Sequence, residues 1–214
     1  MSVALNGTSL SKVKANSLNL AGTFGFTGTV SGLADETPLV LISTFTSDGS
    51  DATASFTSGI DSTYKEYLLV LNNIHPETSG TTLEFQTTTD GSNFNVTTTS
   101  TFFQFRQKEG GSTSGLEYEG GSDQAQGTSF QHLSATVLGD ADSGCSGILK
   151  LYNPSSTTFV KHYMSQIVHP QSSGSQMSEF TAGYFNTTSA ITGIRFKYSS
   201  DEIQGGTIDL FGVV

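Results

Sequence analysis

The sequence predicts an all-β protein, an antiparallel β-sandwich or jelly roll with a short extended N-terminal arm. Apolar and polar residues alternate near the C-terminus, where Ile194, Phe196 and Tyr198 alternate with charged residues. A period of two is typical of a strand with one buried face and one wet face. Turn signals recur roughly every 8 to 12 residues, and no amphipathic helix of useful length occurs, as expected for a sandwich.

Residues 1–35 differ from the rest of the chain. Their segment LNLAGTFGFTGTVSGLA combines small residues, frequent glycine and isolated apolar residues, so it cannot close a core of its own. Two interpretations stay open: a flexible arm, or a β-rich segment that orders only against other copies or a docking partner. Pro38 suits a strand entry. We therefore divide the chain into an anchoring or oligomerisation arm, 1–35, and a β-sandwich domain, 36–214.

The first half of the domain contains six predicted strands. Leu68 to Leu71 are consecutively apolar, so we expect both faces of their strand to be covered. Asp90-Gly91 is a hairpin turn dipeptide between two of the strands. Phe103 and Phe105 alternate with polar residues in the last of the six. The predicted ranges are 38–46, 52–59, 64–76, 81–89, 94–99 and 100–108.

The second half begins with a long polar segment, residues 109–129, followed by a strand at 130–139. This segment is the longest insert without predicted structure, and such loops in compact domains are usually functional or mobile. Four or five strands then follow in close succession from Cys145 to Val214. In the last of them Ile208 and Leu210 alternate with polar residues.

Charge and composition narrow the class of protein. The net charge is −10 and the nine Lys and Arg residues form no run, which argues against nucleic acid as a partner. The single cysteine excludes an intrachain disulfide. The N-terminus lacks the apolar run of a signal peptide, and no stretch approaches the ~20 apolar residues of a membrane span. We expect synthesis in a reducing cytoplasm, without a visible export route and without membrane insertion.

The sequence predicts no catalytic or metal-binding pattern. HxH, HExxH and GxSxG spacings do not occur. His75 and His169 each precede a proline, so we expect both at strand ends near the sheet margin. Cys145 is expected to be a small buried residue. Asp140 and Asp142 have the first spacing of a calcium loop without its later ligands, and a tight turn explains them. We predict no enzyme, no cofactor and no metal.

Aromatic and loop residues supply the candidate contact sites. Tyr118, in segment 109–129, is the best candidate for an exposed contact residue, together with its neighbours Glu117 and Glu119. A pairing of such acids for glycoside hydrolysis is disfavoured, because acids in a Gly-rich loop are usually solvated and their separation is not fixed. Seven phenylalanines fall at strand positions and are expected to fill the core: Phe102, Phe103, Phe105, Phe130, Phe159, Phe180 and Phe185.

Three C-terminal motifs carry a family resemblance. They are LYNPSSTTFVKHYMSQ, AGYFNTTSAITGIRFK and GGTIDLFG, and they resemble virion structural proteins of marine tailed phages such as cyanophages. The resemblance covers residues 64–214 loosely and 145–214 more specifically. Its motifs are structural, so no catalytic residue is carried over. It implies a surface position on the particle as a fibre, knob or decoration protein, usually oligomeric, with a homotrimer favoured.

We therefore expect a non-enzymatic structural protein of a tailed-phage virion that contributes to particle stability or host attachment. The arm would bind other virion proteins, and the loops of the sandwich would meet neighbouring subunits or a host-surface glycan. The alternative is a carbohydrate-binding β-sandwich module, which predicts exposed aromatic residues across one sheet face or a calcium ion in GDADSG. A third function, a glycan hydrolase or lyase, needs paired carboxylates in a cleft.

Overall fold

The computed structural model describes residues 38–112, 114–172 and 174–214, and it contains thirteen strands and no helix in these ranges. The all-β prediction is confirmed, although strands are more numerous than expected. Since these ranges hold no helix, they hold none that could cross a membrane. The expected arm, residues 1–35, lies outside the described residues.

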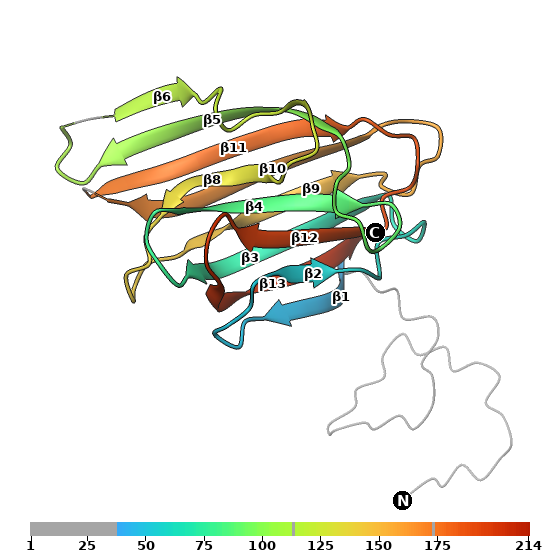
Figure 1. Ribbon diagram of the computed structural model, residues 1–214, viewed down its shortest axis with the longest axis horizontal. Helices are drawn as coiled ribbons and strands as arrows, with labels where there is room; N and C mark the ends of the chain where they lie inside the picture. The colour runs from blue at the N-terminus through green and yellow to red at the C-terminus, as the bar shows by residue number, and fades with distance from the viewer. Residues whose placement is uncertain (1–37, 113, 173) are drawn as a thin grey trace, which may run out of the picture. The chain divides into compact units, whose positions relative to one another are not determined.

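The strands form two antiparallel sheets that pack together as a sandwich (Figure 1). The large sheet has the order β1 (Leu39–Thr46), β13 (Ile203–Val213), β3 (Glu66–Pro76), β9 (Cys145–Tyr152), β10 (Lys161–Gln171), β11 (Ser175–Phe185), β5 (Thr98–Lys108) and β6 (Ser114–Tyr118), and β7 (Ala125–Gly127) also pairs with β5. The small sheet has the order β2 (Ala54–Phe56), β12 (Gly193–Tyr198), β4 (Thr81–Thr88) and β8 (Gln131–Val137).

The core lies between the two sheets and follows the predicted alternation. Ile194, Phe196 and Tyr198 on β12 are buried, while the charged residues between them are half-exposed. The Phe85 ring of β4 meets the Tyr163 ring of β10 edge to face, with centroids 5.0 Å apart. Because most central strands bury every second side chain, as β10 and β13 do, the two inner faces interdigitate into one core.

The hairpin predicted at Asp90-Gly91 is wrong. β4 belongs to the small sheet and β5 to the large one, so the segment between them crosses from one sheet to the other. The Asp90 carboxylate accepts hydrogen bonds from the backbone N–H groups of Ser92 and Asn93, both at 2.8 Å. Bonds from Asn93 and Ser92 hold the pKa of Asp90 well below its usual range. The hydrogen bonds of Asp90 define the turn itself, and they do not specify which strands pair on either side of it.

Segment 109–129 is not a structureless insert. It forms β6, which pairs with β5 in the register Phe103 to Tyr118, and the short β7. Two backbone bonds tie the rest to β5: Glu119 N–H to Phe102 O at 3.0 Å and Ser100 N–H to Gln124 O at 2.9 Å. All five side chains of β6 are exposed, so these strands lack the alternation that reveals a half-buried strand.

The two histidine–proline pairs do not behave alike. β3 ends at Pro76, as predicted, and His75 is half-buried beside the carbonyl of Ser143. β10 continues past Pro170 to Gln171, and His169 is buried between the sheets rather than at the margin. Its prediction as a marginal residue is therefore wrong.

Candidate interaction surface

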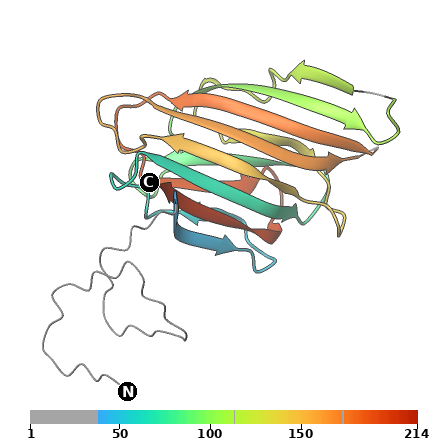
Figure 2. The same ribbon diagram turned by 180° about the vertical axis from the view of Figure 1, so that it is seen from behind.

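The two faces of the large sheet have different surroundings. The small sheet covers the inner face, and no other described element crosses the opposite face, which we call the outer face (Figure 2). The register of the strands identifies the side chains that share it, because residues paired across neighbouring strands point to the same side. We take the outer face as the candidate site on the described part of the chain.

Aromatic residues gather on the outer face over β11, β5 and β6. Phe103 pairs with Phe180 and with Tyr118, and Phe105 pairs with Leu116. The Phe103 and Phe180 rings stack with centroids 5.1 Å apart, and the Phe105 ring meets the Phe180 ring edge to face at 5.8 Å. Leu116 is 65% exposed and Phe105 is 44% exposed. We call these five residues the aromatic end.

Aliphatic residues dominate the opposite end of the outer face, over β1, β13 and β3. Leu41 pairs with Phe211, and Phe211 pairs with Leu68. We call the following six residues the aliphatic end: Leu39, Leu41, Leu68, Val70, Phe211 and Val213. The middle, on β9 and β10, carries Ile148, Met164 and Val168. Apolar side chains thus occur on the strands from one edge of the sheet to the other, and polar side chains lie between them on β9 and β10.

The outer face corrects the expectation that both sides of residues 64–76 are covered. Leu69 and Leu71 point inward and are buried, whereas Leu68 and Val70 point outward and are only half-buried. The run of four apolar residues matches a strand buried on both faces, yet the described residues cover one face only.

The outer face carries little charge. Its charged side chains are Glu66, Lys150 and Asp209, so two carboxylates and one ammonium leave it at −1. Lys150 Nζ donates to Glu66 Oε1 at 3.0 Å, and this bond raises the pKa of Lys150. Asp209 Oδ1 accepts a bond from the Thr44 hydroxyl at 2.5 Å. A chain of net charge −10 therefore has one broad face that is nearly neutral.

Two hollows indent this surface. One has a volume of about 240 Å³ and lies in the middle of the outer face, where Ile148, Tyr152, Met164 and Phe180 contribute to its walls. The other, of about 430 Å³, lies at the β5–β6 edge beside Phe105 and Leu116. Both have more apolar than polar wall, as expected for a contact surface rather than for a site that holds an ion.

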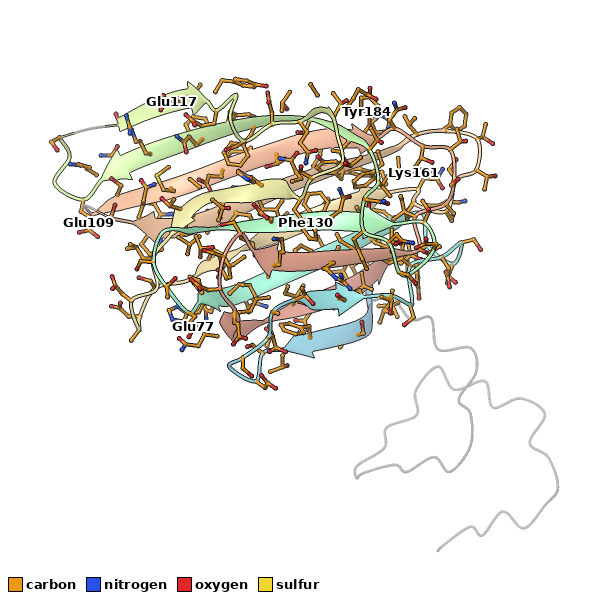
Figure 3. All side chains as sticks on the ribbon, in the orientation of Figure 1. Glu77, Glu109, Glu117, Phe130, Lys161 and Tyr184 are labelled. Carbon is orange, nitrogen blue, oxygen red and sulfur yellow. The ribbon has the colours of Figure 1, made fainter. Side chains whose placement is uncertain are left out.

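The predicted contact residues lie at the edge of the large sheet. Tyr118 is 56% exposed on the outer face, and its hydroxyl bonds to the Asp123 carboxylate, which raises the pKa of the tyrosine. Glu117 is exposed on β6 and pairs with the inward-facing Gln104 (Figure 3). Glu119 follows β6 and is half-buried. The structure thus brings Tyr118 into the aromatic end and leaves Glu117 and Glu119 off the outer face.

The prediction that seven phenylalanines fill the core is wrong for five of them. Phe102 and Phe185 are buried. Phe103, Phe105 and Phe180 lie on the outer face, and Phe159 is 68% exposed in the segment before β10. Phe130 is half-buried beneath the ammonium of Lys197, 4.9 Å from the ring centroid (labelled in Figure 3). The rings that sequence reasoning placed in the core therefore form much of the candidate surface.

A row of polar side chains in contact with one another lies on the surface of the small sheet. His132 Nε2 lies 3.1 Å from Glu84 Oε1, and its Nδ1 lies 3.3 Å from the Ser122 hydroxyl. Acid, imidazole and hydroxyl in this order can activate a nucleophile. Here Lys197 lies 3.6 Å from the same carboxylate and shares its charge, and Gln131 Nε2 donates to Ser122 O at 2.8 Å. These contacts anchor segment 119–130 to the small sheet.

Buried ionisable groups lie inside the sandwich. Burial raises the pKa of the Cys145 thiol to about 12, so the prediction of a small buried residue is confirmed. Lys161 is buried, and its ammonium donates to the Thr187 carbonyl at 2.9 Å; burial lowers its pKa.

Ser143 N–H bonds to Asp140 O at 2.8 Å, as in a tight turn. No cluster of three His, Cys, Asp or Glu side chains suited to a metal occurs in residues 38–112, 114–172 and 174–214.

Comparisons of the chain with protein-family models, with curated proteins and with solved structures found no match. The resemblance of the C-terminal motifs to phage virion proteins accordingly stays a prediction, and the geometry of the outer face is the structural basis for proposing a function.

Proposed function

We propose that this chain is a non-enzymatic structural protein of a tailed-phage particle, displayed at the surface as a fibre, knob or decoration protein. In this proposal the sandwich assembles with other subunits, residues 1–35 attach it to other virion proteins, and the assembly stabilises the particle or contacts the host. A homotrimer is the oligomeric state that the resemblance favours.

The outer face is the observation that supports this proposal. Its exposed and half-buried apolar side chains occur on eight neighbouring strands, from Leu39 on β1 to Leu116 on β6. Soluble monomers rarely expose a contiguous apolar patch larger than a few hundred Å², and larger patches mark interaction surfaces. A structural subunit needs such a surface permanently covered, which suits the low charge around it.

Detection in purified particles tests the proposal. An antibody raised against the purified chain should label intact particles in electron micrographs, and its peptides should appear among the particle proteins in constant ratio to the major capsid protein. If purified particles of the phage that encodes the chain contain none of these peptides and the antibody does not label them, the proposal is wrong.

A carbohydrate-binding module is the second candidate, and the aromatic end favours it. Exposed rings across one sheet face are what sugar-binding surfaces use for stacking. However, Phe103 and Phe180 stack on each other, so part of their ring surface is already occupied. The rest of the outer face mixes aliphatic and polar side chains, which suits a protein surface better. Binding to a glycan array that is lost in Phe105→Ala and Tyr118→Ala would favour the module; retention of particle assembly in the same variants would separate the two functions.

A further inference from the structure

We infer that the outer face of the large sheet is the self-association surface of this protein, and that the same face of a second copy covers it. Such a contact has two-fold symmetry, so it pairs chains and does not by itself close the homotrimer that the resemblance favours. This inference deepens the proposed function and rests on it, because it names the partner at the surface that the proposal uses. The predicted contact residues of segment 109–129 then lie at the margin of the interface rather than at its centre.

The amino-acid pattern of β3 argues that something covers the outer face. Leu68 and Val70 alternate with the buried Leu69 and Leu71, so the strand is apolar on both sides. Strands with a solvated face read as apolar–polar alternation, whereas strands covered on both faces read as continuous apolar runs. β3 therefore has the sequence of a strand between two layers, and the described fold supplies one of them.

The low charge of the outer face allows a second copy to form the second layer and disfavours a strongly basic or acidic partner. Two molecules that each carry −10 repel one another at most orientations. The outer face contributes only −1 of this charge, and its one ammonium is already paired with Glu66 at 3.0 Å. Covering the face therefore brings few like charges together and leaves Lys150 with its partner. A basic or acidic partner would need a complementary field, and this surface has almost none.

The size of the face is sufficient for a stable contact. Neighbouring strands lie about 4.8 Å apart and residues rise about 3.3 Å along a strand, so eight strands of mostly eight to eleven residues present on the order of 1,000 Å². Specific interfaces bury roughly 800 Å² on each partner. Two outer faces can therefore form a contact of ordinary size, with the exposed Met164 near its middle.

Met164 is the position that tests the interface directly. It lies on β10 in the middle of the face and is 54% exposed, so a charge there leaves the isolated fold intact but enters the centre of any face-to-face contact. Met164→Glu should weaken self-association at least roughly a hundredfold, because like charges juxtaposed in an interface cost several kcal/mol. Phe159→Glu is the matched control, since Phe159 is 68% exposed outside the strands of the sheet.

The measurement is the mass of the full chain by light scattering at micromolar concentration. Wild type and Phe159→Glu should both have the mass of an oligomer, and Met164→Glu the mass of one chain, with unchanged circular dichroism. A monomeric wild type, or an oligomer that Met164→Glu leaves intact, overturns the inference. A chain that is monomeric in solution but present in particles overturns the inference and leaves the proposed function standing. An oligomer that Met164→Glu dissociates but that is absent from particles supports the inference and overturns the proposed function.

Cross-linking supplies a second readout that does not depend on disrupting the contact. Cys145 is the single cysteine and is fully buried, so a short bismaleimide joins two copies of Met164→Cys only where their outer faces meet. Phe159→Cys should not cross-link in this way. If the Met164→Cys chain is a monomer and its thiol reacts with maleimide only after residues 1–37 are removed, then the chain's own first residues cover the outer face. This result overturns the inference.

Discussion

His169 and Glu179 form a buried pair between the two sheets, with Nε2 and Oε2 3.1 Å apart and both side chains fully excluded from solvent. The other ring nitrogen, Nδ1, lies 2.9 Å from the carbonyl of Pro170 and donates to it, since a carbonyl oxygen can only accept. Glu179 Oε1 accepts the backbone N–H of Ala135, on β8, at 2.7 Å. One carboxylate thus joins strands from both sheets.

Removing this carboxylate should destabilise the fold strongly. Glu179→Leu leaves His169 Nε2 without its partner and the N–H of Ala135 without its acceptor. Breaking one partner of a buried pair costs about 3–5 kcal/mol. The free energy of unfolding from urea titration measures this. The double variant His169→Leu/Glu179→Leu should lose less than the sum of the single losses, because the two residues are in contact.

Glu109→Leu is the control, because Glu109 is exposed at the end of the β5 strand (Figure 3) and should change the unfolding free energy by no more than about 0.5 kcal/mol. A Glu179→Leu variant as stable as this control would show that the pair does not hold the sheets together.

Cys145 should make the fold sensitive to alkaline pH. Burial raises the pKa of its thiol from 9.0 to about 12, so between these values the unfolded chain loses a proton that the folded chain keeps. The stabilisation is complete below pH 9 and is lost as the pH rises toward 12, by up to about 1.4 kcal/mol per pH unit. Tyr163 and Tyr198, whose pKa values burial also raises, add to the same trend.

Unfolding titrations at several alkaline pH values check this expectation. In Cys145→Ala the unfolding free energy should fall less steeply with pH, by the contribution of one proton released on unfolding. The contribution of the two tyrosines to the slope should remain. Identical slopes for wild type and variant would mean that the thiol ionises as readily in the fold as in the unfolded chain.

The fold class was predictable because strand alternation is a local property. Ile208 and Leu210 are buried and their neighbours are not, as the period of two requires wherever one face of a strand is covered. The pairing of strands is not local. Asp90-Gly91 marks a turn correctly, but the same turn chemistry serves a hairpin or a crossing between sheets, so the separation of β4 from β5 could not be inferred from it.

The candidate surface was less predictable, since the exposure of a strand residue depends on a distant layer. Phe103 and Phe105 alternate with polar residues just as core residues do, and only the position of the small sheet decides that they face outward. One local signal was available: the continuous run Leu68 to Leu71 indicates a strand covered on both sides. Segment 109–129 had no such signal, because the side chains of β6 are all exposed.

Gly183 on β11 should be intolerant of a side chain. A Cβ built there would lie 2.5 Å from the carbonyl oxygen of Thr99 and 2.8 Å from the Tyr163 hydroxyl, and the former belongs to backbone that cannot rotate away. Gly183→Ala should therefore cost about 1–3 kcal/mol through overpacking, seen as a lower urea midpoint. Gly121→Ala is the control, since nothing lies within 4 Å of its Cβ position; equal midpoints for the two variants would contradict the close approach.

The C-terminal strand should be indispensable to the fold. β13 lies between β1 and β3 in the large sheet and buries Ile208 and Leu210, so deleting Thr207 to Val214 removes core residues. It also leaves β1 without its neighbour and β3 paired on one side only, with β9. We expect no cooperative unfolding transition and aggregation of the truncated chain. Deleting Val214 alone should be tolerated, as its side chain is exposed. Deleting residues 1–30 should preserve the unfolding transition and abolish only assembly into particles. A soluble, cooperatively folded chain without Thr207 to Val214 would contradict the central place of β13.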